Sequence, residues 1–526
     1  MTKQGQENDI AGAFGTIRAT DNESRRGFKA RLLTLLAIVG PGLIVMVGDN
    51  DAGGISTYAQ AGQNFGYSLL WTLPLLIPVL MVNQEMVARL GAVSGLGHGR
   101  LIRERLGRRW GNLATGSILL LNFLILITEF IGISLSTSYF GAPAYITVPL
   151  AAVLLFTVTA AGTFRSWERL MMLFVAVNVL IVPLLIVSNA SGHATMHGLT
   201  MPSIRGGATS GGILLIISII GTTVAPWQLF FQQSNIVDKR ITPRWLNYER
   251  VDTLLGSIIV VVSASAIIVA AAAGLSPHGG TSSYTDALGV ARGFAHYVGH
   301  GSGAMFAILL LNASIIGAAA VTLASSYAFG DLTGSRQGLD SRLSEAKGFY
   351  GAFAALLAVA SGVTLLPGAP LGIITLAVQA MCGLMLPSTT IFVLMLANDR
   401  EVLGPWTNTR WMNAIATVVI GALIALSITL MVSTLFPSVD VMRLLVDLSV
   451  VVGCVLAILV PWTFIHTGPA PTYEIKRADW RMPRLALVTP LPMSRGRRFL
   501  LRGVAVYLAV AGVMLVWRMI QLGVHQ

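Results

Sequence analysis

The sequence predicts an all-α polytopic membrane protein. Its 526 residues are 54% hydrophobic and only 11% charged, with a mean hydropathy of +0.73. Those values are typical of proteins that cross a membrane many times. Apolar stretches of the length that spans a bilayer recur along the chain. They are predicted near 33–66, 68–93, 113–139, 142–162, 167–188, 211–237, 251–275, 303–330, 348–367, 369–398, 411–436, 443–466 and 498–520.

The loops between these spans predict the orientation. The net charge of +12 is concentrated after even-numbered spans, at 100–109, 239–250, 336–347 and 476–498. Basic loops face the cytoplasm, so we expect these loops and the basic N-terminus to lie there, in a multi-pass protein of the plasma (inner) membrane. No signal peptide is expected in the polar residues 1–30. The two cysteines lie in apolar segments, so no disulfide framework is expected.

Three regions are expected along the chain. Residues 1–30 form a cytoplasmic tail, and 31–400 form a ten-helix core with two halves, 31–190 and 208–400. Residues 401–526 add further spans. Within them, the proline-rich stretch 467–497 predicts a cytoplasmic linker that lies along the membrane interface through Trp480, Arg481 and Arg484.

The first span contains the polar run Gly48-Asp49-Asn50-Asp51-Ala52-Gly53-Gly54. An unpaired polar group at bilayer depth costs ~2–7 kcal/mol. An ionisable residue there is therefore a functional-site hypothesis, and the glycines favour a broken helix. The run predicts an ion site at a helix break.

A second break is predicted at Gly221-Thr222-Thr223-Val224-Ala225-Pro226-Trp227, inside the sixth span. Pro226 donates no backbone hydrogen bond, so the carbonyl of Thr222 is expected to be free. Ala225, which precedes the proline, is expected to be non-helical. Two breaks five spans apart indicate a 5+5 inverted repeat, in which unwound carbonyls meet near the bilayer midplane.

These residues carry a resemblance. The runs Gly40-Pro41-Gly42, Asp51-Ala52-Gly53-Gly54 and Gly66-Tyr67-Ser68-Leu69-Leu70-Trp71 resemble the first helix of the Nramp family of divalent-metal transporters, and the run 84–91 resembles its second helix. The resemblance covers about residues 33–400. It implies a LeuT-type fold with broken helices 1 and 6.

The resemblance also implies a metal site, with departures from the family pattern. Asp51 stands where the metal-binding aspartate stands, while Gly54 replaces an asparagine ligand and Ala225 replaces a methionine ligand. Together with backbone carbonyls and a glutamine of the tenth span, the expected site comprises Asp51, Gly48, Gly54, Thr222, Ala225 and Gln379.

Other departures concern protons. Trp227 and Gln232 stand where the family has histidines, and Leu126 stands where it has a proton-carrying aspartate. The eight histidines are expected in loops, at span ends or at the terminus, and none lies in either break. The residues expected to form a gate or pathway are Asp49, Glu129, Trp227 and Gln232, with a direct metal role for Asp49 left open.

The departures resemble those of the Nramp-related magnesium transporters. A thioether favours soft ions, and its replacement by Ala225 leaves oxygen donors. Gly54 also lacks a side chain, which is expected to enlarge the cavity further. A wide site with one carboxylate suits partly hydrated Mg²⁺, with Mn²⁺ also accepted. A divalent cation entering at −100 mV gains roughly 4.6 kcal/mol, so uptake needs no coupled proton.

Several alternatives stay open. The nearest is a proton-coupled Mn²⁺/Fe²⁺ symporter, and a second is an organic-solute carrier, whose anionic substrate Asp51 would repel. No motif of catalysis supports an enzyme, and no sizeable soluble domain supports a sensor. No cofactor besides the transported ion, no nucleic acid and no obligate protein partner are expected. Glu85 and Arg89 share a helix face and predict a structural pair or a cytoplasmic gate.

Overall fold

The computed structural model describes residues 9–21, 25–161, 163–207, 209–278, 284–335, 338–341, 343–436, 438–466, 476–489, 491 and 493–524, with the side chains at 434, 466 and 515–524 left aside. In these residues, eleven helices are long and apolar enough to cross a membrane, or twelve if one bent pair is a single span. The predicted all-α polytopic fold is confirmed. The thirteenth expected span, 498–520, falls in the helix Arg495–Val524, whose side chains from residue 515 onward are not described.

The helices of the first half follow the predicted spans closely. They are α2 (Phe28–Ile38), α3 (Pro41–Gly48), α4 (Ala52–Phe65), α5 (Thr72–Ser94), α6 (His98–Leu106), α7 (Arg108–Tyr139), α8 (Ala144–Ala161), α9 (Phe164–Val177) and α10 (Ile181–Val187). The chain reverses from α8 to α9 through a capping box, in which Thr163 and Ser166 satisfy each other's backbone N–H groups.

The second half and the C-terminal helices continue the pattern. They are α11 (Gly192–Thr200), α12 (Ser210–Thr223), α13 (Pro226–Asp238), α14 (Leu246–Gly274), α15 (Ala287–Tyr297), α16 (His300–Thr333), α17 (Lys347–Thr364), α18 (Leu371–Ala397), α19 (Arg400–Leu403), α20 (Arg410–Leu435), α21 (Val441–His466) and α22 (Arg495–Val524).

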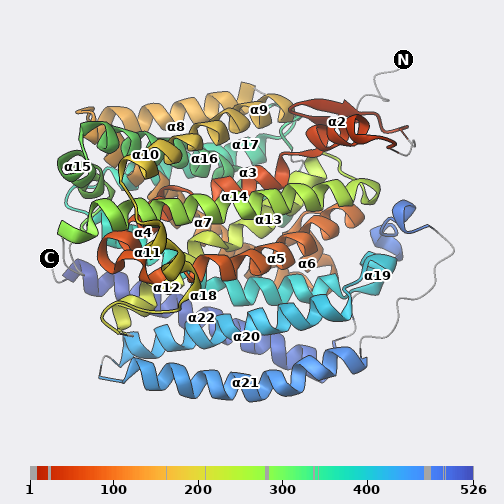
Figure 1. The fold of residues 1–526 in the computed structure, drawn as a ribbon. Helices are drawn as coiled ribbons and strands as arrows, with labels where there is room; N and C mark the ends of the chain where they lie inside the picture. Colours follow the sequence, from red (N-terminus) through yellow and green to blue (C-terminus); the bar gives the residue numbers. More distant parts are fainter. Residues whose placement is uncertain are drawn as a thin grey trace.

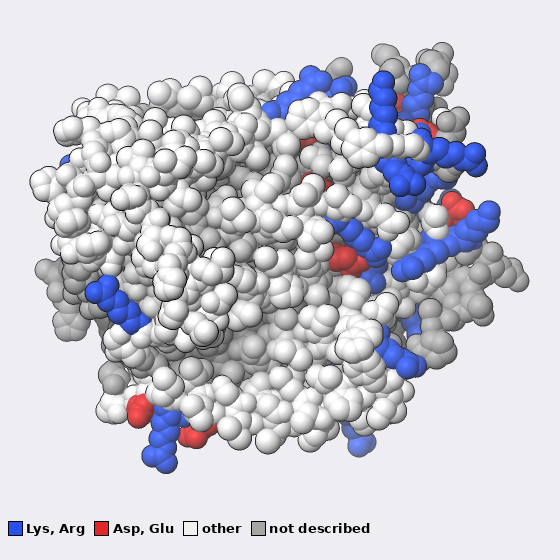
Figure 2. Space-filling view, in the orientation of Figure 1, with Lys and Arg blue, Asp and Glu red and all other residues white. Residues whose placement is uncertain are grey.

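The long helices run side by side along one direction (Figure 1). Lys and Arg gather at the right-hand end of the bundle, while its middle is almost free of charge (Figure 2). We call the end with α2, α6 and α19 the basic end and the opposite end, with α11 and α15, the distal end. The basic loops therefore share one side, as the charge pattern predicts.

The first span has two interruptions, where one is predicted. Besides the break between α3 and α4, the chain bends by 53° between α2 and α3. Val39 is extended and Gly40 has a φ of +152°, which disfavours any other residue. The side chain of Asp252 in α14 accepts the N–H groups of Gly40 and Gly42 at 3.2 and 2.8 Å, and so caps α3. The visible signal for this bend is the Gly40-Pro41 pair.

The N-terminal tail is partly folded. Strands β1 (Ile10–Gly12) and β2 (Gly15–Ile17) form an antiparallel hairpin with Ile10 opposite Ile17. The hairpin packs on α2 and α9. At its turn the backbone N–H of Ala13 donates to Glu168 at 2.5 Å, and the Arg169 guanidinium donates to the Ala13 carbonyl at 2.9 Å. The tail thus forms part of the basic end.

The C-terminal helices lie beside the core. α20 and α22 pack on α18, and α21 lies on the outer side of α20 (Figure 1). The Tyr507 hydroxyl of α22 donates to the Leu384 carbonyl of α18. The linker predicted for 467–497 is described only over 476–489, 491 and 493–497. There Trp480 packs on Gly404 and so contacts protein, whereas the sequence predicted that it lies along the membrane interface.

Candidate metal site

The first break consists of Asp49, Asn50 and Asp51 between α3 and α4. Asp51 is the N-cap of α4, and its Oδ1 accepts the backbone N–H of Gly54 at 2.7 Å. An aspartate at this position stabilises the start of a helix, so the local sequence favours a new helix at Ala52. Asn50 points to α14, where its amide donates to the Val260 carbonyl at 3.3 Å. The break is fully enclosed by protein, and all three side chains are buried.

The second break consists of Val224 and Ala225 between α12 and α13. Ala225 is extended, as expected for a residue before proline, and Pro226 is the first residue of α13. Because Pro226 has no N–H group, the Thr222 carbonyl loses its helical donor. The predicted break is confirmed at the predicted residues.

The two breaks face each other. A Cβ atom added to Gly54 would lie 2.9 Å from the Asp49 carbonyl oxygen and 3.0 Å from Thr222 Oγ1. One turn further along α4, the Tyr58 hydroxyl bonds to Thr223 Oγ1 at 2.7 Å. On the other side of the first break, a Cβ on Gly48 would touch the Trp227 ring at 3.7 Å. The chain therefore brings Gly54 close to Thr222, and Gly48 close to Trp227.

Asp49 has the least satisfied side chain at this meeting point. It is 0% exposed, and neither carboxylate oxygen has a hydrogen-bond partner among the described residues. The Gln228 side chain of α13 and the backbone of Ala225 in the second break lie near the carboxylate. A buried carboxylate with no partner is costly unless a cation or a proton accompanies it. Thr222 Oγ1, at the same place, is likewise unpartnered within the described chain.

Asp51 lies against Glu129 of α7. Glu129 Oε2 accepts the backbone N–H of Ala52 at 3.2 Å, and the two carboxyl groups interact directly. Gly317 of α16 permits this approach, since a Cβ there would lie 2.5 Å from Glu129 Oε2 and 2.9 Å from the Asp51 Cβ. Glu129 of α7 thus contacts the first break.

Gln379 of α18 also reaches the first break. A Cβ on Gly53 would overlap the Gln379 amide, so any larger residue there would push Gln379 out of its place. Gln228 of α13 holds a second amide near the site, and its Oε1 accepts from Gln84 of α5 at 2.9 Å. Gln84 and Gln228 were not among the predicted site residues, because nothing in the sequence indicates that they meet.

Gly54 does not leave an empty space. The sequence predicted that its missing side chain widens the cavity, but the close approach of α12 fills that volume. Both breaks are closed from either end, since Asp51, Ala225 and Trp227 are at most 2% exposed. Any widening therefore requires α4 and α12 to move apart.

Of the residues predicted to form a gate or pathway, Trp227 lies at the breaks and Gln232 lies away from them. Trp227 packs on Phe231 and closes the site on the α13 side. Gln232 does not reach the breaks, because its amide donates to Glu249 and Thr253 of α14.

One histidine lies deeper than predicted. His98 begins α6 at the basic end, yet it is 0% exposed. Its Nδ1 bonds to Gln233 Oε1 at 2.7 Å and its ring packs edge-on against Phe230, both on α13. Burial lowers the pKa of His98 to about 4. The expectation that every histidine lies in a loop or at a span end places this residue correctly along the chain but misses that it is in the core.

The predicted pair of Glu85 and Arg89 is confirmed at 3.0 Å on α5. Glu85 also bonds to Arg250 at 2.6 Å, and Arg89 bonds to the Trp406 carbonyl and to Asn408. These contacts tie α5 to the segment before α20 at the basic end, away from the breaks. They fit the structural pair rather than an ion ligand.

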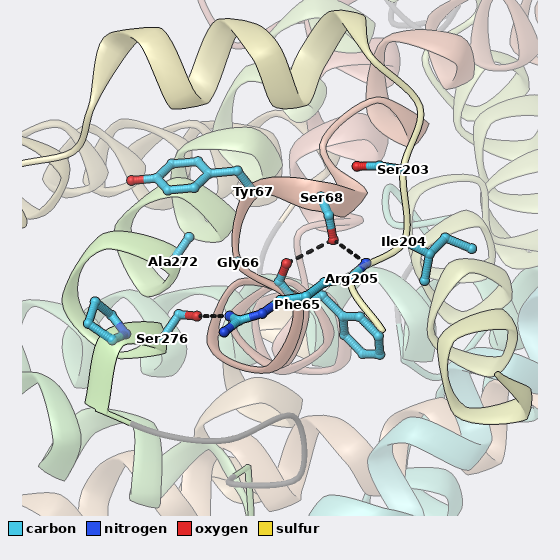
Figure 3. Close-up of a pocket in the computed structure, with 10 residues that line it drawn as sticks. Phe65, Gly66, Tyr67, Ser68, Ser203, Ile204, Arg205, Ala272 and Ser276 are labelled. Atoms are coloured by element: carbon cyan, nitrogen blue, oxygen red, sulfur yellow. Dashed lines mark hydrogen bonds between the residues drawn. The ribbon is translucent and has the colours of Figure 1, made fainter. Parts of the chain in front are cut away.

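A cavity of about 510 Å³ lies at the distal end of α4 (Figure 3). The Arg205 side chain crosses it to Ser276 at 2.9 Å, and the Arg205 backbone N–H donates to Ser68 at 3.2 Å. Phe65, at the far end of α4, is about 20 Å from Ala52 at 1.5 Å per residue. The cavity is therefore separated from the breaks by the length of α4.

The donor set is sparse. Among the described residues, no group of three or more His, Cys, Asp and Glu side chains is placed to hold a metal ion. The breaks instead offer two carboxylates, Asp49 and Asp51, with backbone carbonyls. A site of this kind suits a hard cation that keeps part of its water shell.

Comparisons with known proteins agree with this architecture. The model of the family "Natural resistance-associated macrophage protein-like" matches residues 42–433. The divalent metal cation transporter MntH of Bacillus subtilis is 26% identical over 424 residues, which cover 78% of this chain and 94% of that protein. MntH of Xylella fastidiosa is 27% identical over 435 residues, covering 80% and 89%.

Solved structures agree on the fold. The manganese transporter of Eremococcus coleocola superposes with a TM-score of 0.64 and 23% identity, covering 84% of this chain and 97% of that one. The LeuT-type fold with two broken helices is thereby confirmed. The chain belongs to the Nramp family, a family of membrane transporters and not of enzymes.

Proposed function

We propose that this protein carries divalent metal ions across the membrane by alternating access, with Mg²⁺ as its main substrate and Mn²⁺ as a second one. The observation that carries the proposal is Asp49, whose buried carboxylate has no partner among the described residues and faces the second break. With Asp51 it provides two hard oxygen donors. The names of the MntH relatives support metal ions as the substrate class.

We further propose that uptake needs no proton. Neither break contains a histidine, and Ala225 and Trp227 supply no titratable group. In this proposal Asp51, Gly48, Gly54, Thr222, Ala225 and Gln379 surround the ion, while Asp49 joins them as a ligand. The basic end faces the cytoplasm of a plasma membrane, and residues 31–400 form the transport core.

One observation favours the alternative, a proton-coupled Mn²⁺/Fe²⁺ symporter. Glu129 and Asp51 form a buried carboxyl pair, and such a pair readily holds one proton. If that proton left each time an ion bound, transport would be coupled.

Ion flux into proteoliposomes tests both the main proposal and the symporter alternative. Mg²⁺, Mn²⁺ and Ca²⁺ are offered outside while internal pH and membrane potential are recorded. We expect Mg²⁺ and Mn²⁺ to enter with a dependence on voltage and without acidification. Acidification in step with the ions would establish the symporter instead, and no Mg²⁺ entry or competition would refute the main proposal. Asp447→Asn, an exposed carboxylate on α21, is the matched control for substitutions at the breaks.

A further inference from the structure

A second group of buried acids lies outside the two breaks. Glu249 and Asp252 are three residues apart on α14, so they share one face of that helix. Both are 0% exposed, and they interact directly with each other. Gln232 of α13 lies against them, with its amide nitrogen bonded to Glu249 Oε1 at 3.3 Å and to Thr253 Oγ1 at 3.1 Å.

Each member of this group keeps one oxygen without a partner. Asp252 uses Oδ2 to cap α3, and Glu249 uses Oε1 to accept from Gln232. The atoms that remain are Glu249 Oε2, Asp252 Oδ1 and Gln232 Oε1, none of which has a hydrogen-bond partner in the described part of the chain. All three only accept when the acids are ionised, so they cannot satisfy one another. Acceptors of this kind need a proton or a cation as partner.

The charges around the group are not balanced. The charged groups that reach it from neighbouring helices are Glu168 of α9 and Lys239 at the end of α13. Lys239 is buried, and its ammonium group already bonds to Glu168 at 2.6 Å and to the carbonyls of Ile38 and Val39. One ammonium thus faces three carboxylates. Unbalanced charge of this kind is costly in a buried place.

The group lies between the breaks and the basic end. Gln232 is seven positions beyond Ala225, or about 10 Å along α13 at 1.5 Å per residue. Lys239 is another seven positions on, where it fills the bend between α2 and α3. An ion that leaves the breaks toward the basic end along α13 therefore meets Gln232 first and Lys239 second.

We propose that Glu249, Asp252 and Gln232 form a second binding site for the transported divalent cation, an exit site on the way to the basic end. The proposal rests on the function proposed above. The donors are carboxylate and amide oxygens, which hard cations prefer. Lys239 balances part of the charge while the bend between α2 and α3 is closed, and the incoming ion completes the balance.

Mn²⁺ binding to the purified wild-type protein in nanodiscs provides the first test. Isothermal titration should give two ions per chain, and anomalous scattering at the manganese edge from crystals of the same protein should give one peak at the breaks and one between Glu249 and Asp252. A single peak at the breaks, with the acids in contact through a shared proton, would overturn the exit site and leave the proposed function intact. No peak at either place would instead refute the proposed function.

Variants make the assignment specific. Combining Glu249→Gln with Asp252→Asn should weaken the exit site at least about tenfold and leave one ion at the breaks. Asp49→Asn should do the reverse and leave one ion at the exit site. Glu104→Gln, an exposed acid at the basic end, should keep both. Two full-affinity ions in the double variant would contradict the proposal.

Gln232→Leu repeats the test without removing a charge. Leucine has a volume similar to that of glutamine but offers no oxygen as a metal ligand. The variant therefore serves even if the double variant does not fold. We expect weaker binding at the exit site, unchanged binding at the breaks and an unchanged elution volume on gel filtration. Unchanged binding at both sites would exclude Gln232 as a ligand.

Discussion

The first break contains two carboxylates and an amide, whereas the second contains Val224 and Ala225 and no side chain that ionises. The first is held by two hydrogen bonds to carboxylates, one from the Gly54 N–H to Asp51 and one from the Ala52 N–H to Glu129. The second is held by the covalent restriction of Pro226. The first break therefore supplies charged side chains to the site. The second supplies backbone carbonyls and determines the shape of the site. We expect the first to determine whether a cation binds and the second to determine which cation.

The largest effect is expected for Asp51→Ala. It removes a carboxylate of the first break and the N-cap of α4, which is worth about 1 kcal/mol of stability. Uptake of Mg²⁺ and Mn²⁺ in proteoliposomes should be abolished. Asp51→Asn keeps the cap and serves as the control, so it should restore the thermal stability without restoring uptake. Measurable uptake by Asp51→Ala would show that the first break does not supply the negative charge that binds the ion.

Asp49→Asn separates ion binding from folding. Asp49 makes no side-chain hydrogen bond in the described chain, so we expect the substitution to leave thermal stability unchanged or raised. Affinity for the ion should fall by about 10- to 100-fold. Titration with Mn²⁺ and thermal unfolding of the same sample measure both. A large loss of stability with normal affinity would make Asp49 a structural residue.

Pro226→Ala tests the second break. The new N–H group can bond to the Thr222 carbonyl, and the joined helix should be more stable by up to about 3 kcal/mol. Loss of a free carbonyl should weaken ion binding by about fivefold to tenfold. Helix content and thermal stability are compared with Mn²⁺ affinity. Stability and affinity rising together would refute the role given to this break.

Ala225→Met tests selectivity at the second break. A thioether is a soft ligand, so the ratio of Cd²⁺ to Mg²⁺ affinity should rise roughly threefold to fivefold, with Asp49 and Asp51 still binding. Competition between the two ions for Mn²⁺ uptake measures the ratio. Ala225→Leu, similar in volume and without sulfur, is the control. An equal shift in both variants would attribute the change to size.

The smallest effect on transport is expected from His98, which contacts α13 beyond the second break. Its pKa of about 4 lies below the ordinary 6.5, so the folded protein favours the neutral ring. Stability should therefore be full above about pH 6.5 and fall by up to about 3 kcal/mol as pH drops to 4. Uptake should be flat from pH 6.5 to 8. His98→Gln should flatten the stability profile measured by thermal unfolding across pH.

The breaks could be predicted from the sequence because they depend on local chemistry. Asp51 with its glycines and Ala225 with Pro226 act within a few residues of themselves, and both lie where expected. The partner of Glu129 could not be predicted, since Ala52 is 77 positions away in the chain. The same holds for His98, whose burial depends on Gln233 of another helix.

Ranking Asp49 against Asp51 also needed the structure. The two residues are similar in the sequence, but the Asp51 side chain caps the N-terminus of α4, whereas the Asp49 side chain has no hydrogen bond in the described chain. Gly54 was misread for a related reason. A missing side chain leaves space only if no neighbour fills it, and here α12 does.

The hairpin of β1 and β2 has a consequence for biosynthesis. Ala13 leaves the ribosome long before its partner Glu168, from which it is separated by 155 positions. At ~5–20 residues per second, the hairpin waits about 8–30 s before α9 exists. The helices in between are thus inserted while the hairpin can dock on α2 but not yet on α9. The basic end can acquire its final shape only after most of the first half has been made.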